Sequence, residues 1–414
     1  MFKTDYKVSI NSFLWEKALE KLKSDFKMNL TQTDSMMIIL LLNLYKCKNE
    51  IRSSDNLYLA VEHPSELCEQ AYEKKTISIY SKLIAELKLV HPNSTIDQIV
   101  DEALANFIVT EISFYTDEIS PLYTIVGSKN HTMQKVTARA VNDMKLDTES
   151  TTLIDACCAT GALYFGLKTY NWKEVILNDL NPLRTNFLNV LKLQPLKLIK
   201  RLLETDFSFI STPKTKNPVL QEYKHSLDVY SINRGKYHKV DCNVEIAYKM
   251  FIVQCIDKQH IETEKEILKR MSRFLPAHLK LQNATITQED ALTYLKSETT
   301  DKLVLLDVPY IASESTCGIS DYDYDKFHTK VAHHLQKAEF PFLYYCRSTP
   351  PKSNFKHNGE EAIKIMKMKL GRYFFDKGFL LEKVHNGTDT EIIISNRHYS
   401  NEQFTWYDFE MDLT

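Results

Sequence analysis

Two short stretches of alternating apolar and polar residues open similar segments near the start of the chain. Val8-Ser9-Ile10 and Ile77-Ser78-Ile79 share this alternation, and the second stretch lies 69 positions after the first. A period of two predicts a β-strand with one buried face. Each stretch is followed by apolar residues at helical spacing, then by a turn and a second such helix. The pattern therefore predicts two strand-helix-helix units within residues 1–115.

Polar residues mark where the helices of these units begin. Ser12 and Ser81 stand before the first helix of each unit, where a hydroxyl group commonly accepts hydrogen bonds from the backbone. Segments 31–34 and 93–97 supply hydroxyl or Asp side chains before the second helices. We therefore expect the same order of one strand and two helices in both units.

A unit of this kind, roughly 40 residues long, resembles the ribbon-helix-helix DNA-binding domain, whose paired strands lie in the major groove. Such domains work as dimers, and two copies in one chain could form that dimer internally. Val8, Ile10, Ile77 and Ile79 would then face the helices. The exposed strand face would contact DNA through Lys7, Ser9, Asn11, Thr76, Ser78 and Tyr80. The alternative is a helical region whose two hairpins only look alike.

The pattern changes after about residue 120 to short apolar strands separated by helices. The strands are expected at 152–155, 174–179, 302–307, 340–346 and 391–395. This alternation predicts an α/β domain with a largely parallel sheet over residues 120–414. Residues 204–281 are polar and mostly helical, and we interpret them as an insertion beside the ligand crevice.

Composition limits the class of protein. The chain has 414 residues, 43% of them hydrophobic, and a formal net charge of −2, which excludes a highly cationic nucleic-acid coat. The eight cysteines form no C-x-x-C pair, which argues against structural zinc and against a disulfide scaffold. The longest apolar run, at 36–42, is too short to cross a bilayer. We therefore expect a cytoplasmic protein with reduced thiols and neither a metal nor a membrane partner.

Three strands of the α/β region end in residues suited to binding a nucleotide. Strand 152–155 ends at Asp155 and leads into a turn of small residues that lets a ligand approach the backbone. Asp179 follows the next strand, 24 residues after Asp155, where nucleotide-binding folds place an acid against ribose hydroxyls. A third strand ends in Asp307-Val308-Pro309-Tyr310. We expect these residues to meet in one crevice.

In this order, the residues resemble the Dam-like DNA adenine-N6 methyltransferases, which use S-adenosylmethionine. The resemblance covers roughly residues 123–397. The matching segments are Gly127-Ser128-Lys129, the turn 155–161, Asp179, Asp290, Asp307-Val308-Pro309-Tyr310 and the closing strand 391–396. It implies a Rossmann-like S-adenosylmethionine-dependent methyltransferase fold with a helical insertion, and double-stranded DNA as the partner.

The resemblance also implies a role for each matched residue. The residues expected to bind S-adenosylmethionine are Lys129, Asp155, Ala156, Cys157, Gly161, Asp179 and Asp290. An adenine amine is a poor nucleophile because its lone pair is delocalised into the ring. Asp307 and the backbone carbonyl of Val308 would therefore accept its two N–H bonds. Pro309 would fix this geometry, and Tyr310 would stack on the base flipped from the duplex.

The chain departs from the family pattern at two positions. Val308 replaces a proline, although the group used there is a backbone carbonyl that valine also supplies. Ala159 replaces a loop glycine, and a positive φ at this position would cost alanine about 1 kcal/mol or more. The second departure bears more directly on donor binding.

We therefore expect an S-adenosylmethionine-dependent DNA methyltransferase, of the kind found in restriction-modification systems, that acts as a monomer or homodimer. Within the insertion, segment 231–239 mixes cations with an amide and an aromatic residue, and Arg234, Lys236 and Lys239 are expected to contact DNA. Two alternatives stay open. One is a catalytically decayed fold that only binds DNA or a partner, and the other is a methyltransferase of RNA or of a protein amide.

Overall fold

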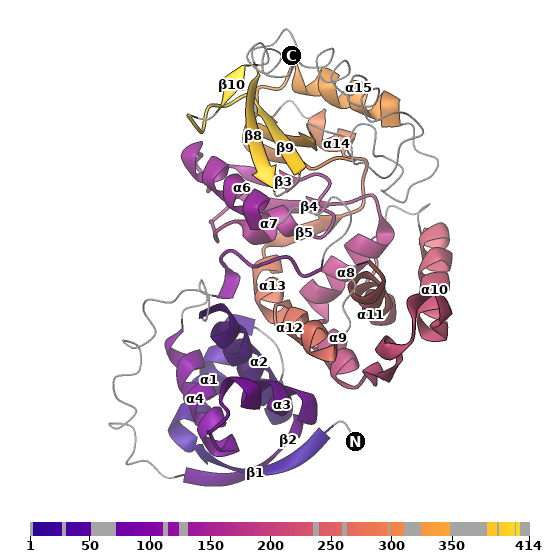
Figure 1. The fold of residues 1–414 in the computed structure, drawn as a ribbon. Helices are drawn as coiled ribbons and strands as arrows, with labels where there is room; N and C mark the ends of the chain where they lie inside the picture. The colour runs from indigo at the N-terminus through magenta and orange to yellow at the C-terminus, as the bar shows by residue number, and fades with distance from the viewer. Residues whose placement is uncertain are drawn as a thin grey trace.

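The computed structural model describes residues 3–26, 30–50, 72–110, 115–123, 131–234, 240–258, 263–296, 299–309, 324–347, 379–386, 389–401 and 403–405. Figure 1 shows a smaller N-terminal unit, coloured indigo to purple, at one end of the molecule and an α/β part at the other. The two parts meet through the helices that lie between strands β4 (Glu174–Asn178) and β5 (Ala284–Thr287).

The N-terminal unit contains the two predicted strand-helix-helix segments. Its elements are β1 (Lys3–Asn11), α1 (Ser12–Phe26), α2 (Gln32–Glu50), β2 (Tyr72–Tyr80), α3 (Ser81–Val90) and α4 (Ile96–Val109). The two strands form an antiparallel ribbon, which lies on the outer side of the unit in Figure 1. Val8, Ile10 and Ile79 are buried, as predicted from the alternation.

The register of the ribbon relates the two units by an approximate twofold axis. Lys7 pairs with Thr76, and these two residues are equivalent positions of the repeat because they lie 69 positions apart. On either side of this pair the strands run in opposite directions, so Ser9 pairs with Lys74 and Asp5 pairs with Ser78. The second helices, α2 and α4, also meet, where the Asn106 amide donates to Asn43 Oδ1 at 3.0 Å. The repeat therefore folds as an internal pseudodimer.

The expected helix caps are present for the second helices but not in the expected form at Ser81. Thr95 and Gln98 form a reciprocal capping box at the start of α4. Thr31 Oγ1 accepts a hydrogen bond from the Asp34 N–H, 3.1 Å away, at the start of α2. The prediction that Ser81 is the N-cap of α3 was wrong by one position, because Tyr80 is the N-cap and its side chain makes no capping bond.

The α/β part is built on a mixed sheet, eight-stranded in the described residues. Besides β4 and β5, its strands are β3 (Thr152–Asp155), β6 (Lys302–Leu306), β7 (Phe342–Arg347), β8 (Leu380–Asn386), β9 (Asp389–Ser395) and β10 (Phe404–Thr405). The spatial order is β10-β8-β9-β7-β6-β3-β4-β5. Strands β5, β4, β3, β6 and β7 are parallel, and β9 runs antiparallel between β7 and β8. This confirms the predicted α/β class with a largely parallel sheet.

Both faces of the sheet are covered, because neighbouring residues of a strand belong to different core clusters. Leu303 and Leu305 of β6 pack on the side of α6 (His131–Asp143) and α7 (Ala162–Gly166). Val304 and Leu306 pack on the side of α14 (Leu292–Leu295) and α15 (Tyr324–Leu335). Burial on both faces explains why these strands are apolar throughout rather than alternating.

The segment between β4 and β5 is mostly helical and begins at Pro182, ahead of the insertion predicted at residues 204–281. Its helices are α8 (Pro182–Leu193), α9 (Pro195–Leu203), α10 (Pro218–Arg234), α11 (Val244–Val253), α12 (Glu264–Met271) and α13 (Phe274–Leu281). Two 3-10 segments (Phe207–Ser211 and Lys214–Lys216) and one π-helical turn (Gln254–Lys258) connect them. Helices α10, α11 and α13 pack on α8, while α13 also contacts α2 of the N-terminal unit. The insertion therefore joins the two parts of the protein.

Polar contacts between the two parts are concentrated near the end of β2. The Tyr80 hydroxyl donates to Glu204 Oε1 at 3.0 Å, and Tyr80 is only 1% exposed. Lys82 forms an ion pair with Glu264 and donates to the backbone carbonyl of Thr205. The expectation that Tyr80 lies on the exposed face of the ribbon was therefore wrong, because this end of the strand is covered by the α/β part.

A buried histidine lies at the same interface and predicts a loss of stability in acid. His278 is 1% exposed, stacks on Phe26 at 5.9 Å, and directs Nδ1 to the carbonyls of Leu191 and Lys192. Burial lowers the pKa of His278 below its usual value, so the unfolded chain takes up the proton first as the pH falls below about 6.5. Between pH 7.5 and pH 5.5, we expect the free energy of unfolding of wild type to fall by on the order of 1 kcal/mol more than that of His278→Gln. Urea unfolding at both pH values measures this difference, and equal losses would contradict it.

Candidate active site

Three aspartates lie at the carboxyl edge of the sheet, on neighbouring strands. Asp155 ends β3, Asp179 follows β4 and Asp307 follows β6. Burial raises the pKa of the Cys157 thiol, and the negative charges of all three carboxylates raise it further. Asp155 is fully buried and Asp307 half-exposed. The structure therefore brings these predicted site residues together around one side chain.

The strand order places this cluster where open α/β sheets bind ligands. From β3 the chain moves to β4 and β5 on one side, whereas β6 and β7 lie on the other side. The order thus reverses between β3 and β6, and the crevice outside the carboxyl ends of such strands is the general ligand site. Asp155 and Asp307 stand on either side of this reversal.

The carboxylate of Asp179 is held by three donors from its own surroundings. Oδ2 accepts the Ala159 N–H at 2.8 Å and the Arg184 guanidinium at 3.2 Å, while Oδ1 accepts the Asn181 N–H at 2.8 Å. A carboxylate has about four acceptor positions, so about one remains for a ligand hydroxyl. Arg184 was missed by the sequence reasoning. Its position five residues after Asp179, in the first turns of α8, was the available signal.

Asn178, the last residue of β4, fixes the loops that surround the site. Its Nδ2 donates to the carbonyls of Ala156 at 2.8 Å and Glu289 at 2.9 Å. Its Oδ1 accepts the Glu289 N–H at 2.8 Å and the Thr287 hydroxyl at 3.0 Å. The side chain is 1% exposed, and all of these bonds are internal. Asn178 is therefore a positioning residue that joins the turns after β3 and β5.

The turn between β3 and α7 has the backbone strain anticipated for Ala159. Ala159 has φ +50° and Gly161 has φ +71°. A Cβ atom at Gly161 would lie 2.7 Å from the Phe165 ring, so glycine is required there. Ala159 carries the same left-handed conformation without being glycine, although its N–H is used by Asp179. The alanine that replaces the family's loop glycine therefore has the strained left-handed conformation that we expected.

Restoring glycine at position 159 should stabilise the protein. A left-handed alanine costs about 1–2 kcal/mol, partly offset by the larger backbone entropy of glycine in the unfolded chain. We expect Ala159→Gly to raise the free energy of unfolding by up to about 1 kcal/mol. Urea unfolding measures this change, with Ala162→Gly as the control, because Ala162 is helical and glycine should destabilise it. A lower stability of Ala159→Gly would contradict the strain.

The residues after β6 differ in their surroundings. The Val308 side chain is 2% exposed and packs in the core cluster that contains Leu292 and Phe327. Pro309 is half-exposed, and Tyr310 lies outside the described residues. Val308 is therefore a core residue, which gives a physical reason for valine at this position beyond the use of its carbonyl.

Asp290 has a local structural role at the same edge of the sheet. It follows β5, and its Oδ1 accepts the Leu292 N–H at 2.9 Å at the start of α14. Lys129, Lys236 and Lys239 lie outside the described residues, as does the side chain of Arg234. The ribbon backbone is described at the predicted DNA-contacting positions, but the side chains of Lys7, Ser9, Asn11, Thr76 and Ser78 are not. Their roles stay predictions.

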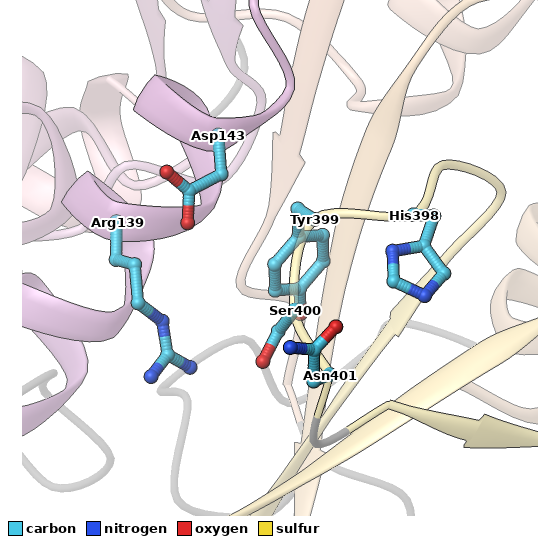
Figure 2. A pocket seen from close by; sticks show the side chains of 6 residues that line it. All are labelled: Arg139, Asp143, His398, Tyr399, Ser400 and Asn401. Carbon is cyan, nitrogen blue, oxygen red and sulfur yellow. The ribbon is translucent and has the colours of Figure 1, made fainter.

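A polar depression of about 410 Å³ lies on the opposite edge of the sheet from the three aspartates. Figure 2 shows Arg139 and Asp143 of α6 facing the loop after β9. Because β9 is antiparallel to β7, this loop lies at the amino edge of the parallel strands. Here Arg139 pairs with Glu382, which is 1% exposed. The depression is therefore separate from the cluster of Asp155, Asp179 and Asp307.

Comparison of the sequence with models of known protein families gives no match, and comparison with curated proteins gives none either. Among the residues that the structure describes, no helix is both long and apolar enough to cross a membrane. Within the same residues, no group of three or more His, Cys, Asp and Glu side chains is arranged to hold a metal ion.

Proposed function

We propose that this protein is an S-adenosylmethionine-dependent DNA methyltransferase that modifies the N6 amine of adenine in duplex DNA. The observation that carries the proposal is the convergence of Asp155, Asp179 and Asp307 at the strand-order reversal. The sequence predicts these residues from the apolar strands that they follow and from the resemblance to the Dam-like family. Their meeting at one edge of the sheet supports the proposal.

The strand order gives independent support. The five parallel strands run in the order β5-β4-β3-β6-β7, and β9 lies between β7 and β8, antiparallel to both. This order is compatible with the Rossmann-like fold that the resemblance implies. Strand β9 contains the segment that resembles the closing strand of the Dam-like family.

The residues at the crevice fit the methyl donor. Asp155 would lie near its amino group, the backbone of the turn at Ala156, Cys157 and Gly161 would line it, and Asp179 would accept a ribose hydroxyl. Asp290 would lie near its adenine, and Lys129 would contact its carboxylate. The donor would supply an electrophilic methyl group on a sulfonium. The three bonds from Ala159, Asn181 and Arg184 fix Asp179 in place before any ligand arrives.

Asp307 supplies the acceptor that the amine requires. Its half-exposed carboxylate follows β6, so it can reach a base that enters the crevice while its backbone stays fixed by the sheet. The buried Val308 side chain anchors the next peptide, whose carbonyl would take the second N–H bond. Tyr310 would hold the flipped base by stacking.

The internal pseudodimer supports duplex DNA as the substrate. Its ribbon alternates between a face buried against helices and a face with Lys7, Ser9, Lys74 and Thr76 at successive register positions. Two-stranded ribbons of this kind enter the major groove. This favours DNA over RNA or a protein amide.

One observation favours a second function, that of a DNA-binding protein without catalysis. The strained left-handed backbone of Ala159, at a position where the family has glycine, is expected of a donor site that is no longer selected for catalysis. Labelled S-adenosylmethionine offered to duplex DNA, RNA and a protein mixture separates the possibilities. Label in duplex DNA is expected, and label in RNA or protein would contradict the proposal. Duplex binding without label in any acceptor would favour the non-catalytic function.

A further inference from the structure

We infer that the ribbon of a single chain recognises a short DNA sequence, or word, that lacks twofold symmetry. Binding to such a word holds the enzyme on the DNA in one orientation. The inference rests on the proposed binding of duplex DNA, but not on methyl transfer. Its basis is the register of β1 with β2 together with the sequence difference between the two halves of the repeat.

The structure provides a complete ribbon within one chain. The approximate axis passes through the pair Lys7 and Thr76, which are equivalent positions of the repeat. In a homodimer the residue on this axis would face its own copy, and palindromic operators mirror that symmetry. Here the register pairs a lysine with a threonine, so the twofold symmetry is broken at its centre. A second chain is not needed to complete the ribbon.

The sequence difference extends along the face opposite Val8 and Ile10. At equivalent positions β1 has Asp5 where β2 has Lys74, and the central pair differs as described. Of the equivalent positions 5 and 74, 7 and 76, and 9 and 78, only the last two hold the same residue type, serine. Because each side-chain type favours different base edges, the two halves of this face favour different bases.

The α/β part also breaks the symmetry, since among the described residues it contacts the ribbon at the end of β2. The ion pair of Lys82 with Glu264 and the bond of Tyr80 to Glu204 hold the β2 end. The equivalent positions in the first unit are Phe13 and Asn11, and phenylalanine cannot form that ion pair. Binding to an asymmetric word would therefore place the catalytic crevice on a defined side of it.

Selection of bound duplexes from a random library, with the full chain and no methyl donor, tests the inference. We expect a preferred word that differs from its own reverse complement, bound by one chain per duplex. A palindromic word, two chains per duplex, or no preferred word would overturn it. Methyl transfer is measured separately, so failure of the proposed activity would be recognised independently of the word.

A variant with a more symmetric ribbon sharpens the test. D5K/K7T gives positions 5, 7 and 9 the residue types of Lys74, Thr76 and Ser78. The centre of its selected word should become an inverted repeat. The control is K17T/E20K, which makes the same change in charge on exposed residues of α1 and should leave the word unaltered. An unchanged word for D5K/K7T would overturn the role of these positions.

Discussion

Replacement of Asp307 by asparagine is expected to reduce methyl transfer by about 10²- to 10³-fold, the scale seen when one preorganised electrostatic contact is lost. The amide keeps the shape of the side chain but removes the negative charge that draws the N–H bond as the amine attacks. Asp307 is half-exposed, so the folded state should change little. Single-turnover transfer to duplex DNA at saturating donor and DNA isolates the chemical step.

Asp301→Asn is the matched control for this variant. Asp301 is exposed and directly precedes β6, so this substitution makes the same chemical change at the opposite end of the strand. Its transfer rate should equal that of wild type. Equal rates for Asp307→Asn and Asp301→Asn would contradict the role of Asp307. A loss of duplex binding by Asp307→Asn alone would place its function in binding rather than in transfer.

The largest effect on stability is expected at Lys280, on α13. Its ammonium group is buried and donates to the backbone carbonyls of Thr116 at 2.9 Å, Phe165 at 3.3 Å and Leu167. Lys280→Met keeps the length of the side chain but removes the donor to all three carbonyls. The Leu167 carbonyl still accepts the Glu118 N–H at 3.3 Å, and each buried carbonyl left without a partner costs about 1–3 kcal/mol. Because methionine also avoids burying a charge, we expect a net loss of about 2–4 kcal/mol.

The effect of Lys280→Met should depend on pH. Burial lowers the pKa of Lys280 to about 7, below its value in the unfolded chain, so protonation favours unfolding as the pH falls from about 10.5 to about 7. The stability difference between wild type and variant should therefore be larger at pH 9 than at pH 7. Urea unfolding gives both values. Lys168→Met, at an exposed lysine after α7, is the control and should change little.

A variant as stable as wild type at both pH values would contradict this account of Lys280. A difference that shrinks as the pH rises would contradict the direction of the pKa shift. In either case the three carbonyls would have to find other donors, such as water.

Local patterns predicted the secondary structure well. The alternation around Val8 and Ile79 predicted the two strands of the ribbon, and the apolar stretches that end in Asp155 and Asp307 predicted two strands that the structure pairs in parallel. In both cases the physical cause is near in sequence, because the strand period and the burial of a parallel sheet act on consecutive residues. The offset of the repeat even matches the register of the ribbon.

Contacts between distant segments were not predictable in the same way. Tyr80 was expected to be exposed, but its partner Glu204 lies 124 positions away. Lys280 gave no signal either, since its acceptors are backbone carbonyls more than 100 positions earlier. Asn178, which precedes Asp179 in the chain, was not predicted as a site residue, although it joins two loops. A side chain that is satisfied by a remote backbone group leaves no spacing to recognise.

The central claim is methyl transfer to the exocyclic amine of adenine. The most direct measurement is nucleoside analysis of unmethylated duplex DNA after incubation with the protein and S-adenosylmethionine, beside Asp307→Asn. We predict N6-methyladenine with wild type and its loss with the variant. Intact DNA without any methylated base, or a methyl group on another base, would contradict the claim.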